Sequence, residues 1–171
     1  MIPPMYDHQN RTFAFGQQSP LIFDMSDPGT GKTRAELELF RQRRLKGGGK
    51  MLVLATKSTL YPAWGSDIEK FTPDLRYVIA NASNRAKAFA TDADIYITNH
   101  DASKYIDTNQ KTTLKGFDTL VIDESTAYKH RTASRSKAVS KFRSRFAHIA
   151  LLTGTPNPNT ILDIWHQAYL L

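Results

Sequence analysis

The sequence alternates short apolar runs with longer stretches of helical periodicity, and this alternation constrains the fold more than any other feature. Nearly continuous apolar runs are typical of strands covered on both faces, and here they span residues 21–23, 51–54, 77–79, 95–97, 120–122 and 149–152. Between them, apolar residues repeat at helical spacing in two sets, Leu60, Trp64, Ile68 and Phe71, and Ala138, Val139, Phe142 and Phe146. This order predicts an α/β fold with a mostly parallel central sheet, right-handed crossovers and helices on both faces.

The length of the chain predicts one domain over residues 1–171, because 171 residues with 40% hydrophobic composition suffice for one core. No internal repeat or interdomain linker interrupts the pattern. Cysteine is absent, no apolar run approaches the roughly 18 residues of a membrane-spanning helix, and the first residues lack a signal-peptide pattern. We therefore expect a cytoplasmic protein that does not enter a membrane.

The net charge of +7 is concentrated in one segment. Between Ser125 and Leu162 there is no acidic residue, whereas seven basic residues occur: Lys129, Arg131, Arg135, Lys137, Lys141, Arg143 and Arg145. The segment is either a solvated basic face or a contact for a polyanion. Helical spacing from about Ser134 predicts one ridge of Lys137, Lys141 and Arg145, which could follow the phosphates of a nucleic acid. No pattern for reading bases accompanies it, so we expect salt-sensitive, nearly sequence-independent affinity.

A phosphate-binding loop is predicted after the first apolar run, where ligands of a parallel sheet gather. The segment 26–33 reads Ser-Asp-Pro-Gly-Thr-Gly-Lys-Thr and matches this loop except that Ser26 replaces the usual first glycine. We expect the loop to cradle ATP phosphates through Asp27, Gly29, Thr30 and Gly31. Lys32 would then reach the β- and γ-phosphates, and the hydroxyl of Thr33 would ligate Mg²⁺. The alternative is a chance turn of the same composition.

Two adjacent carboxylates, Asp123 and Glu124, end the fifth apolar run. Like charges repel at such a position unless a cation lies between them. With a phosphate loop upstream, Asp123 is expected to hold Mg²⁺ and Glu124 to orient and polarise the attacking water. The alternative is a pair that only caps the next helix.

The motifs and their order resemble the first RecA-like lobe of a superfamily-two helicase, closest to the SWI/SNF-type translocases on double-stranded DNA. The resemblance extends over essentially the full length, and its most discriminating element is Leu-Thr-Gly-Thr-Pro at residues 152–156. The matching segments are 24–33 (motif I), 51–56 with Trp64 and 69–71 (motif Ia), 96–100 (motif Ib), 123–126 with Lys129 (motif II), 152–156 with Asn159 (motif III) and 164–165 (a leucine-tryptophan pair in the family).

This resemblance implies a three-layer RecA-like fold with ATP and Mg²⁺ as ligands. It implies that Thr153, Gly154 and Thr155 couple the nucleotide site to DNA, although Thr153 and Thr155 could simply cap a turn. Residues 6–9 resemble the Q motif, in which the amide of Gln9 would read adenine. Family lobes also contact DNA after motifs Ia and Ib, which makes Lys57, Ser58, Asn99 and Lys104 rivals of the basic ridge. Thr126 stands where motif II often has histidine, so coupling to motif III is expected to be built differently.

The resemblance implies an ATP-binding lobe of a DNA-dependent ATPase that moves on double-stranded DNA. Such motors need a second RecA-like lobe with an arginine finger, in the same protein or a partner, and this sequence has no room for one. We expect the isolated lobe to be weakly active or inactive. Alternatives are a lobe of an RNA or single-strand helicase, and a nucleic-acid-binding module with a vestigial nucleotide site. A small-molecule kinase would need a lid that the sequence lacks.

Overall fold

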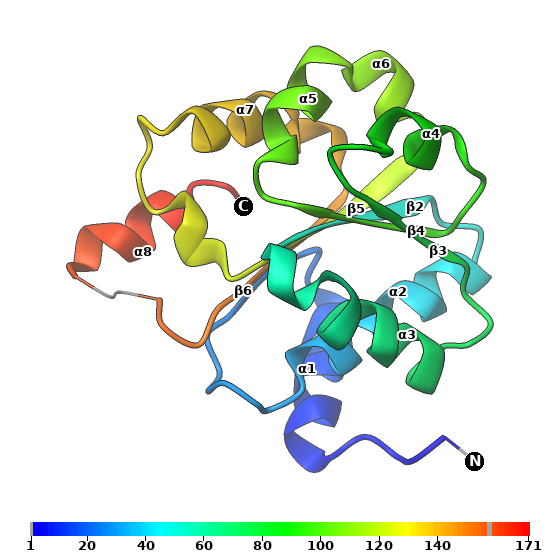
Figure 1. Ribbon diagram of the computed structural model, residues 1–171. Coiled ribbons are helices and arrows are strands. Elements are labelled where there is room, and N and C mark those ends of the chain that lie inside the picture. The colour runs from blue at the N-terminus through cyan, green and yellow to red at the C-terminus, as the bar shows by residue number, and fades with distance from the viewer. Residues whose placement is uncertain (1, 157–158) are drawn as a thin grey trace.

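The computed structural model describes residues 2–156 and 159–171, which form an α/β fold around a parallel sheet (Figure 1). The strands lie in the order β1-β6-β5-β2-β4-β3, and every neighbouring pair is parallel. Each predicted apolar run lies within one strand, so the predicted sheet is confirmed. The strands are β1 (Leu21–Asp24), β2 (Lys50–Ala55), β3 (Tyr77–Ala80), β4 (Ile95–Asn99), β5 (Phe117–Asp123) and β6 (His148–Leu152).

Helices and helical turns connect the strands. The α-helices are α1 (Asp7–Gln18), α2 (Lys32–Leu45), α3 (Ser66–Phe71), α4 (Arg85–Ala90), α5 (Ala102–Thr108), α6 (Gln110–Thr113), α7 (Ser134–Phe142) and α8 (Ile161–Ala168). Three 3₁₀ turns are η1 (Lys57–Thr59), η3 (Ser125–Tyr128) and η4 (Arg143–Arg145), and η2 (Leu60–Gly65) is a π-helical turn. In the part of the chain that the structure describes, none of these helices combines the length and apolarity needed to span a membrane.

The sheet separates two hydrophobic clusters, which gives the predicted three layers. Alternate residues of a strand point to opposite faces, and in β2 Val53 joins one cluster whereas Leu52 and Leu54 join the other. The first cluster contains side chains of α2, η2 and α3, and the second contains side chains of α5 and α7. Figure 1 shows the same division, with α1, α2 and α3 on one side of the sheet and α4, α5, α6 and α7 on the other.

Register places the two predicted halves of the site at the same level of the sheet. Leu152 of β6 is paired with Asp24 of β1 on one side and with Asp123 of β5 on the other. Only one strand therefore separates the strand that leads into the phosphate loop from the strand that carries the carboxylates. At about 4.8 Å between neighbouring strands, their ends lie about 10 Å apart. This is short enough for one triphosphate and its metal ion to contact both.

Candidate active site

The phosphate loop between β1 and α2 has the backbone that its glycines predict. Gly29 and Gly31 have φ angles of 78° and 75°, in the left-handed region that favours glycine. A side chain on Gly31 would also collide with the amide of Gln9, whereas the space around Gly29 is open. The loop leads directly into α2, so the positive end of the helix dipole adds to the attraction for phosphate.

Lys32 and Ser26 organise the interior of this loop. The Lys32 ammonium group donates to the carbonyl oxygens of Ser26 (2.7 Å) and Asp27 (3.0 Å), so it lies folded over the loop. Phosphate oxygens are stronger acceptors for an ammonium group than neutral carbonyls are, so the position suits an anion. Ser26, at the usual glycine position, donates its hydroxyl to Oδ1 of Asp24 at 2.6 Å. The departure from the motif thus ties the loop to the end of β1.

The two carboxylates lie within the electrostatic reach of Lys32. Burial raises the pKa of Asp123, while hydrogen bonds from Trp64 and from the Glu124 amide, together with the Lys32 charge, act in the opposite direction. Burial also raises the pKa of Glu124, Asp123 raises it further, and Lys32 lowers it. Because Lys32 acts on both groups, the structure brings together the phosphate loop and the Asp-Glu pair.

Glu124 has a strained backbone at this site. Its φ of 50° is the one positive φ of a non-glycine residue among the described residues. Such conformations cost about 1–3 kcal/mol and cluster at functional sites. The strain supports a role of the Glu124 side chain beyond capping η3, for which the structure shows no side-chain hydrogen bond.

Trp64 is a site residue to which sequence reasoning assigned no contact. Its indole Nε1 donates to Oδ2 of Asp123 at 2.9 Å, and the Glu124 amide donates to Oδ1 at 3.0 Å. Trp64 is fully buried in the π-helical turn η2, where helical spacing predicted an ordinary helix. The available signal was a tryptophan at a core position, since a buried indole N–H needs an acceptor. Its bond fixes the orientation of the carboxylate.

The predicted coupling segment after β6 lies directly against the phosphate loop. The amide of Thr153 donates to the carbonyl of Asp24 (3.0 Å), and the buried Thr153 hydroxyl accepts from the amide of Thr155 (3.1 Å). A Cβ on Gly154 would lie 2.6 Å from Cγ of Pro28, so only glycine permits this approach. Thr153 and Thr155 form a turn as the alternative held, but the turn also contacts the loop.

A buried polar bridge connects motif II to α8. The hydroxyl of Ser125 donates to Oε1 of Gln167 at 2.6 Å, and Nε2 of Gln167 donates to the carbonyl of Pro156 at 2.7 Å. Ser125 and Gln167 are both fully buried. Ser125 immediately precedes Thr126, which stands where the family often has histidine. Sequence reasoning placed Ser125 in motif II but missed Gln167, because a glutamine within an amphipathic helix gives no sign of burial.

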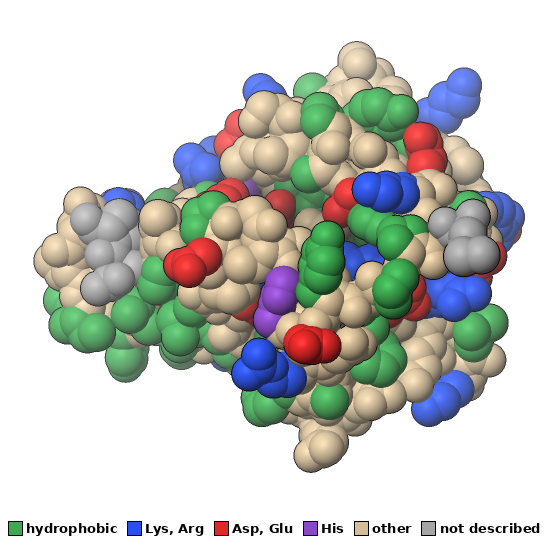
Figure 2. All heavy atoms as spheres, turned by 90° about the horizontal axis from the view of Figure 1, so that it is seen from below, with side chains coloured by type: hydrophobic (Ala, Val, Ile, Leu, Met, Phe, Trp, Pro, Cys, Tyr) green, Lys and Arg blue, Asp and Glu red, His purple; other side chains and the backbone are tan. Residues whose placement is uncertain are grey.

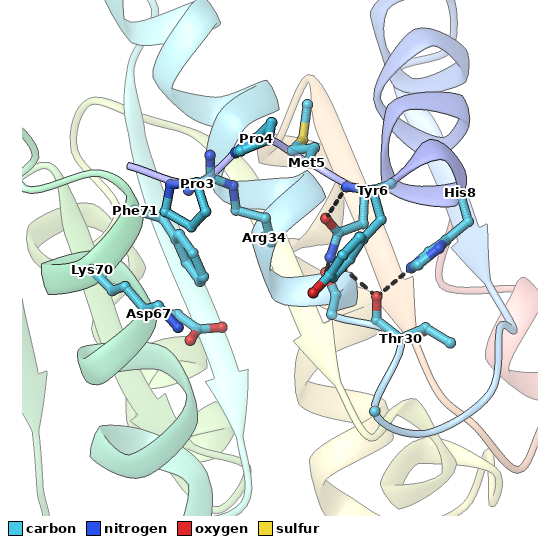
Figure 3. A pocket seen from close by; sticks show the side chains of 13 residues that line it. Pro3, Pro4, Met5, Tyr6, His8, Thr30, Arg34, Asp67, Lys70 and Phe71 are labelled. Atoms are coloured by element: carbon cyan, nitrogen blue, oxygen red, sulfur yellow. Dashed lines mark hydrogen bonds between the residues drawn. The ribbon is translucent and has the colours of Figure 1, made fainter. Parts of the chain in front are cut away.

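Gln9 lies in α1 and is hydrogen-bonded to the backbone of the phosphate loop. It is 7% exposed, and its Nε2 donates to the carbonyls of Thr30 (3.2 Å) and Gly31 (3.3 Å). Its Oε1 accepts from the amide of Tyr6 at 3.0 Å. Both ends of the amide are therefore bonded to backbone. A pocket of about 440 Å³ opens beside Gln9 (Figure 3), and its lining is Pro3, Pro4, Met5, Tyr6, His8, Gln9, Gly29, Thr30, Gly31, Arg34, Asp67, Lys70 and Phe71.

The predicted basic ridge is only partly formed. Helix α7 begins at Ser134 as expected but ends at Phe142, so Arg145 lies in the 3₁₀ turn η4 and does not continue a helical ridge with Lys137 and Lys141. Lys141 forms an ion pair with Asp107 of α5 at 3.0 Å. Lys137 is exposed. The prediction of one helical ridge is therefore wrong for Arg145.

The rival nucleic-acid contacts also separate. Asn99 is 7% exposed and its amide is bonded to Arg85 and Asp101, so the structure does not present it to a ligand at the surface. Lys57 is exposed and follows β2, which places it at the edge of the sheet where strands end. Arg145 precedes β6 and lies toward the opposite edge. A nucleic acid bound along one edge of the sheet would therefore not contact both Lys57 and Arg145.

The site residues fit magnesium better than a metal that needs a full cage of protein ligands. Among the described residues, no three histidine, aspartate or glutamate side chains converge in a way that could hold a metal ion. Mg²⁺ keeps several waters and uses one or two protein ligands together with substrate phosphates. Thr33 at the start of α2 and Asp123 at the end of β5 supply oxygen ligands of this kind at one edge of the sheet.

A family model described as the SNF2-related domain matches residues 14–170, which is most of the chain. The chain belongs to this family. The match contains the phosphate loop, the Asp-Glu pair and the Leu-Thr-Gly-Thr-Pro segment, so the resemblance inferred from the motifs is confirmed. It begins after Gln9, and the Q-motif assignment stays a prediction.

The chain is also similar to individual proteins and to a solved structure. The chain is 29% identical over 155 residues to protein p41 of Acyrthosiphon pisum secondary endosymbiont phage 1, covering 84% of this chain and 34% of p41. It is 30% identical over 148 residues to the ISWI chromatin-remodeling complex ATPase CHR17 of Arabidopsis thaliana, covering 80% of this chain and 13% of CHR17. The structure of the Sulfolobus solfataricus SWI2/SNF2 ATPase core in complex with dsDNA matches with a TM-score of 0.82 and 25% identity, covering 100% of this chain and 36% of that one. The SNF2-related chain thus spans about a third or less of the length of these relatives.

Proposed function

We propose that this SNF2-related chain is the ATP-binding lobe of an ATPase that couples Mg²⁺-ATP hydrolysis to movement on double-stranded DNA. The observation that carries the proposal is the convergence of Lys32 with Asp123 and Glu124 at one edge of the sheet. The charge of Lys32 acts to lower the pKa of both carboxyl groups. The left-handed glycines of the loop supply the backbone that phosphates need. The relatives that carry the words ATPase and dsDNA in their names support the same reading.

Each residue of the site has a defined task in this proposal. The amides of Gly29, Thr30 and Gly31 and the Lys32 ammonium group bind the phosphates. Thr33 and Asp123 would hold Mg²⁺, which neutralises phosphate charge when it is bound. Trp64 and the Glu124 amide keep the Asp123 carboxylate oriented toward this position.

Glu124 is the proposed general base. Its carboxylate is not held by the bond that fixes Asp123, and its pKa is raised by burial and by the neighbouring carboxylate. A general base works best when its pKa moves toward the working pH, so this environment makes Glu124 a better proton acceptor for the attacking water than an exposed glutamate would be. Asp123 remains the residue nearer to the metal.

The coupling route in this proposal runs through motif III. Gly154 touches Pro28 of the phosphate loop, so a shift of the loop on nucleotide binding displaces residues 153–155. The hydrogen bonds from Ser125 to Gln167 and from Gln167 to Pro156 connect motif II to the same segment, so a shift of motif II would also displace it. These two contacts replace, in our proposal, the charged histidine that the family often has at position 126.

A second RecA-like lobe is part of the proposal. The exposed apolar surface at α8 supports the presence of a binding partner. Three side chains of α8, Ile161, Leu162 and Trp165, and that of Tyr169 just after it are apolar and exposed. Figure 2 shows hydrophobic side chains gathered at the left end of the molecule. Exposed apolar patches of this kind mark interaction sites. The partner lobe would supply the arginine that stabilises the transition state, which is worth about 10³–10⁵ in turnover.

Calorimetry with Mg²⁺-ATP tests the nucleotide part of the proposal. We expect binding by the chain and its loss in Lys32→Ala, because the ammonium group is the main charge on the phosphates. Lys46→Ala is the matched control, since Lys46 is exposed just beyond the other end of α2. No magnesium-dependent binding to the unaltered chain, or equal binding by both variants, would contradict the proposal.

The nucleic-acid part is tested by fluorescence anisotropy with duplex DNA, single-stranded DNA and RNA of equal length. We expect preference for the duplex, little sequence dependence, and affinity that falls steeply with salt. Lys57 lies in η1 after β2 and Lys137 lies on α7, so the variant Lys57→Ala or Lys137→Ala with the larger loss of affinity identifies the surface that is used. Preference for RNA or a single strand would instead support a sister helicase lobe. Duplex binding together with absent ATP binding would support a vestigial nucleotide site.

A further inference from the structure

The left-handed backbone of Glu124 needs restraint from the residues around it. Its φ of 50° makes the folded chain about 5- to 150-fold less favourable than an ordinary backbone would, so it persists only where other contacts enforce it. The 3₁₀ turn η3 follows Glu124 directly and extends from Ser125 to Tyr128. Ser125 is bonded to Gln167 of α8, which holds the first end of the turn. The contacts of Tyr128 hold the second end.

The hydroxyl of Tyr128 lies between two residues of the segment that follows β4. Tyr128 is 1% exposed, and its hydroxyl oxygen lies 3.0 Å from Oγ of Ser103 and 3.2 Å from Nδ1 of His100. The rings of His100 and Tyr128 meet edge-on, with 5.2 Å between their centres. The hydroxyl of Ser136 in α7 also donates to the backbone carbonyl of Tyr128 at 3.4 Å. The second end of η3 is therefore held from α5 and from α7.

The contacts around the Tyr128 hydroxyl can all be hydrogen bonds at once in only one direction. The hydroxyl of Ser103 donates to the carbonyl of His100 at 2.7 Å, so it accepts from the Tyr128 hydroxyl. The Tyr128 oxygen then accepts from Nδ1–H of His100. Burial lowers the pKa of His100 to about 4, so the ring is neutral and has one N–H. Nε2 of His100, which is buried without a partner among the described residues, then carries no proton, and no donor is left unpaired.

The restraint supplied by this hydroxyl is as large as the strain at Glu124. Two hydrogen bonds together contribute about 5- to 150-fold to a folding equilibrium, which is the same order as the cost of the left-handed backbone. The amide of Ala127 donates to the carbonyl of Glu124 at 3.0 Å, so the turn moves as a unit with Glu124. Loss of the Tyr128 hydroxyl therefore removes what the strained backbone needs.

We propose that Tyr128 is a positioning residue for Glu124: its hydroxyl, bonded to His100 and Ser103, fixes η3 and holds Glu124 in the left-handed conformation. The inference rests on the proposed function for the task of Glu124 as general base. Because the backbone of Glu124 is fixed in this way, its carboxylate leaves the chain in one direction relative to Asp123. Tyr128 acts only through Glu124.

Nuclear magnetic resonance of the full chain tests this restraint. A residue with a positive φ has its amide proton unusually close to its own α-proton, so the two protons give a strong nuclear Overhauser cross-peak. We expect this strong cross-peak for Glu124 in the unaltered chain and only the strength of an ordinary residue in Tyr128→Phe, which keeps the buried ring. A cross-peak of full strength in Tyr128→Phe would overturn the inference.

Tyr105→Phe is the matched control for this measurement. Tyr105 is a half-buried tyrosine of α5, and its hydroxyl forms no hydrogen bond within the part of the chain that the structure describes. The Glu124 cross-peak should keep its full strength in this variant. An equal weakening in Tyr105→Phe and Tyr128→Phe would overturn the inference, because the hydroxyl bonds of Tyr128 would then not be the cause.

A cycle of stability measurements gives a second test. Glycine adopts a left-handed backbone without strain, so the stability of Glu124→Gly relative to Glu124→Ala measures the strain at this position. This gain in the folding equilibrium constant, measured by urea denaturation, should be at least about fivefold smaller when Tyr128→Phe is also present. A merely structural tyrosine would lower stability and leave the gain unchanged, which would overturn the inference.

The outcomes separate this inference from the proposed function. If Mg²⁺-ATP does not bind, the task of Glu124 as general base is wrong, whereas the cross-peak and the stability cycle still report on the restraint. If Mg²⁺-ATP binds and Glu124 keeps its backbone in Tyr128→Phe, only the inference is wrong. Should Tyr128→Phe not fold, Ser103→Ala removes the acceptor of the Tyr128 hydroxyl. The Glu124 cross-peak should weaken there as well, and full strength would overturn the inference.

Discussion

The close approach of Gly154 to Pro28 leads to a sharp prediction for Gly154→Ala. Gly154 does not have a left-handed φ, so alanine meets no backbone strain there. The added Cβ would instead lie 2.6 Å from Cγ and 2.7 Å from Cδ of Pro28. Carbon atoms prefer separations of about 3.5–4.0 Å, so the phosphate loop must move by about 1 Å. The rigid proline ring cannot rotate away from the contact.

The cost should appear in nucleotide binding more than in stability. Overpacking of this kind costs about 1–3 kcal/mol. Pro28 is exposed, so the empty loop can shift outward with little effect on the free energy of unfolding. The loop that binds phosphates cannot shift in this way, and the affinity for Mg²⁺-ATP should fall about 5- to 150-fold.

Calorimetry with Mg²⁺-ATP and urea denaturation measure the two effects on the same samples. The double variant Pro28→Ala/Gly154→Ala should bind Mg²⁺-ATP nearly as tightly as Pro28→Ala does, because the two ring carbons that collide with the new Cβ are gone. Unchanged ATP affinity in Gly154→Ala would refute the reasoning. A double variant as weak as the single one would show that Gly154 acts through another contact.

Three further predictions concern buried polar groups. Burial raises the pKa of Glu36 from 4.5 to about 7, so its contribution to stability is present at acidic pH and is lost as the pH rises through 7. The free energy of unfolding, measured by urea denaturation, should show this when the value for Glu36→Gln is subtracted from that of the unaltered chain. This difference should fall by about 2–3 kcal/mol between pH 5 and pH 8. Trp64→Phe removes the donor to Asp123, and the loss of that hydrogen bond should lower the free energy of unfolding by about 1.5–3 kcal/mol. The same substitution should cost less in the Asp123→Asn variant than in the unaltered chain. Equal losses in the two would count against the hydrogen bond. Gln167→Leu leaves the Ser125 hydroxyl buried without its acceptor and should cost about 1–3 kcal/mol in thermal or chemical unfolding, a loss that Ser125→Ala/Gln167→Leu should partly reverse if the bridge is its source.

Local pattern was enough to predict the frame of the fold and the centre of the site. Strands buried on both faces must be apolar along their whole length, so the six runs were visible without any knowledge of their partners. The phosphate loop needed glycine at two left-handed positions, and Gly29 and Gly31 occupy them. Asp123 ends a strand, and parallel strands end at one edge, so its approach to the loop followed from topology.

Patterns over longer distances in the chain gave poorer predictions. The basic ridge extrapolated one helical period from Lys137 to Arg145, but α7 ends at Phe142 and a 3₁₀ turn follows. Asn99 was taken for a surface contact from its place in a motif, whereas its amide is bonded inside the protein. A period of 3.6 residues carries no information about where tertiary packing ends a helix.

The amino-acid sequence by itself determined which segments become strands, where the glycines bend the chain around a phosphate, and which strand presents acidic groups. These properties depend on neighbours within a few residues. The tertiary structure alone decided that Trp64 bonds Asp123, that Gly154 rests on Pro28, and that the buried Nε and Nη1 of Arg34 have no hydrogen-bond partner among the described residues. The physical reason is that a side chain's hydrogen-bond partner is chosen by proximity in the packed core, between residues far apart along the chain.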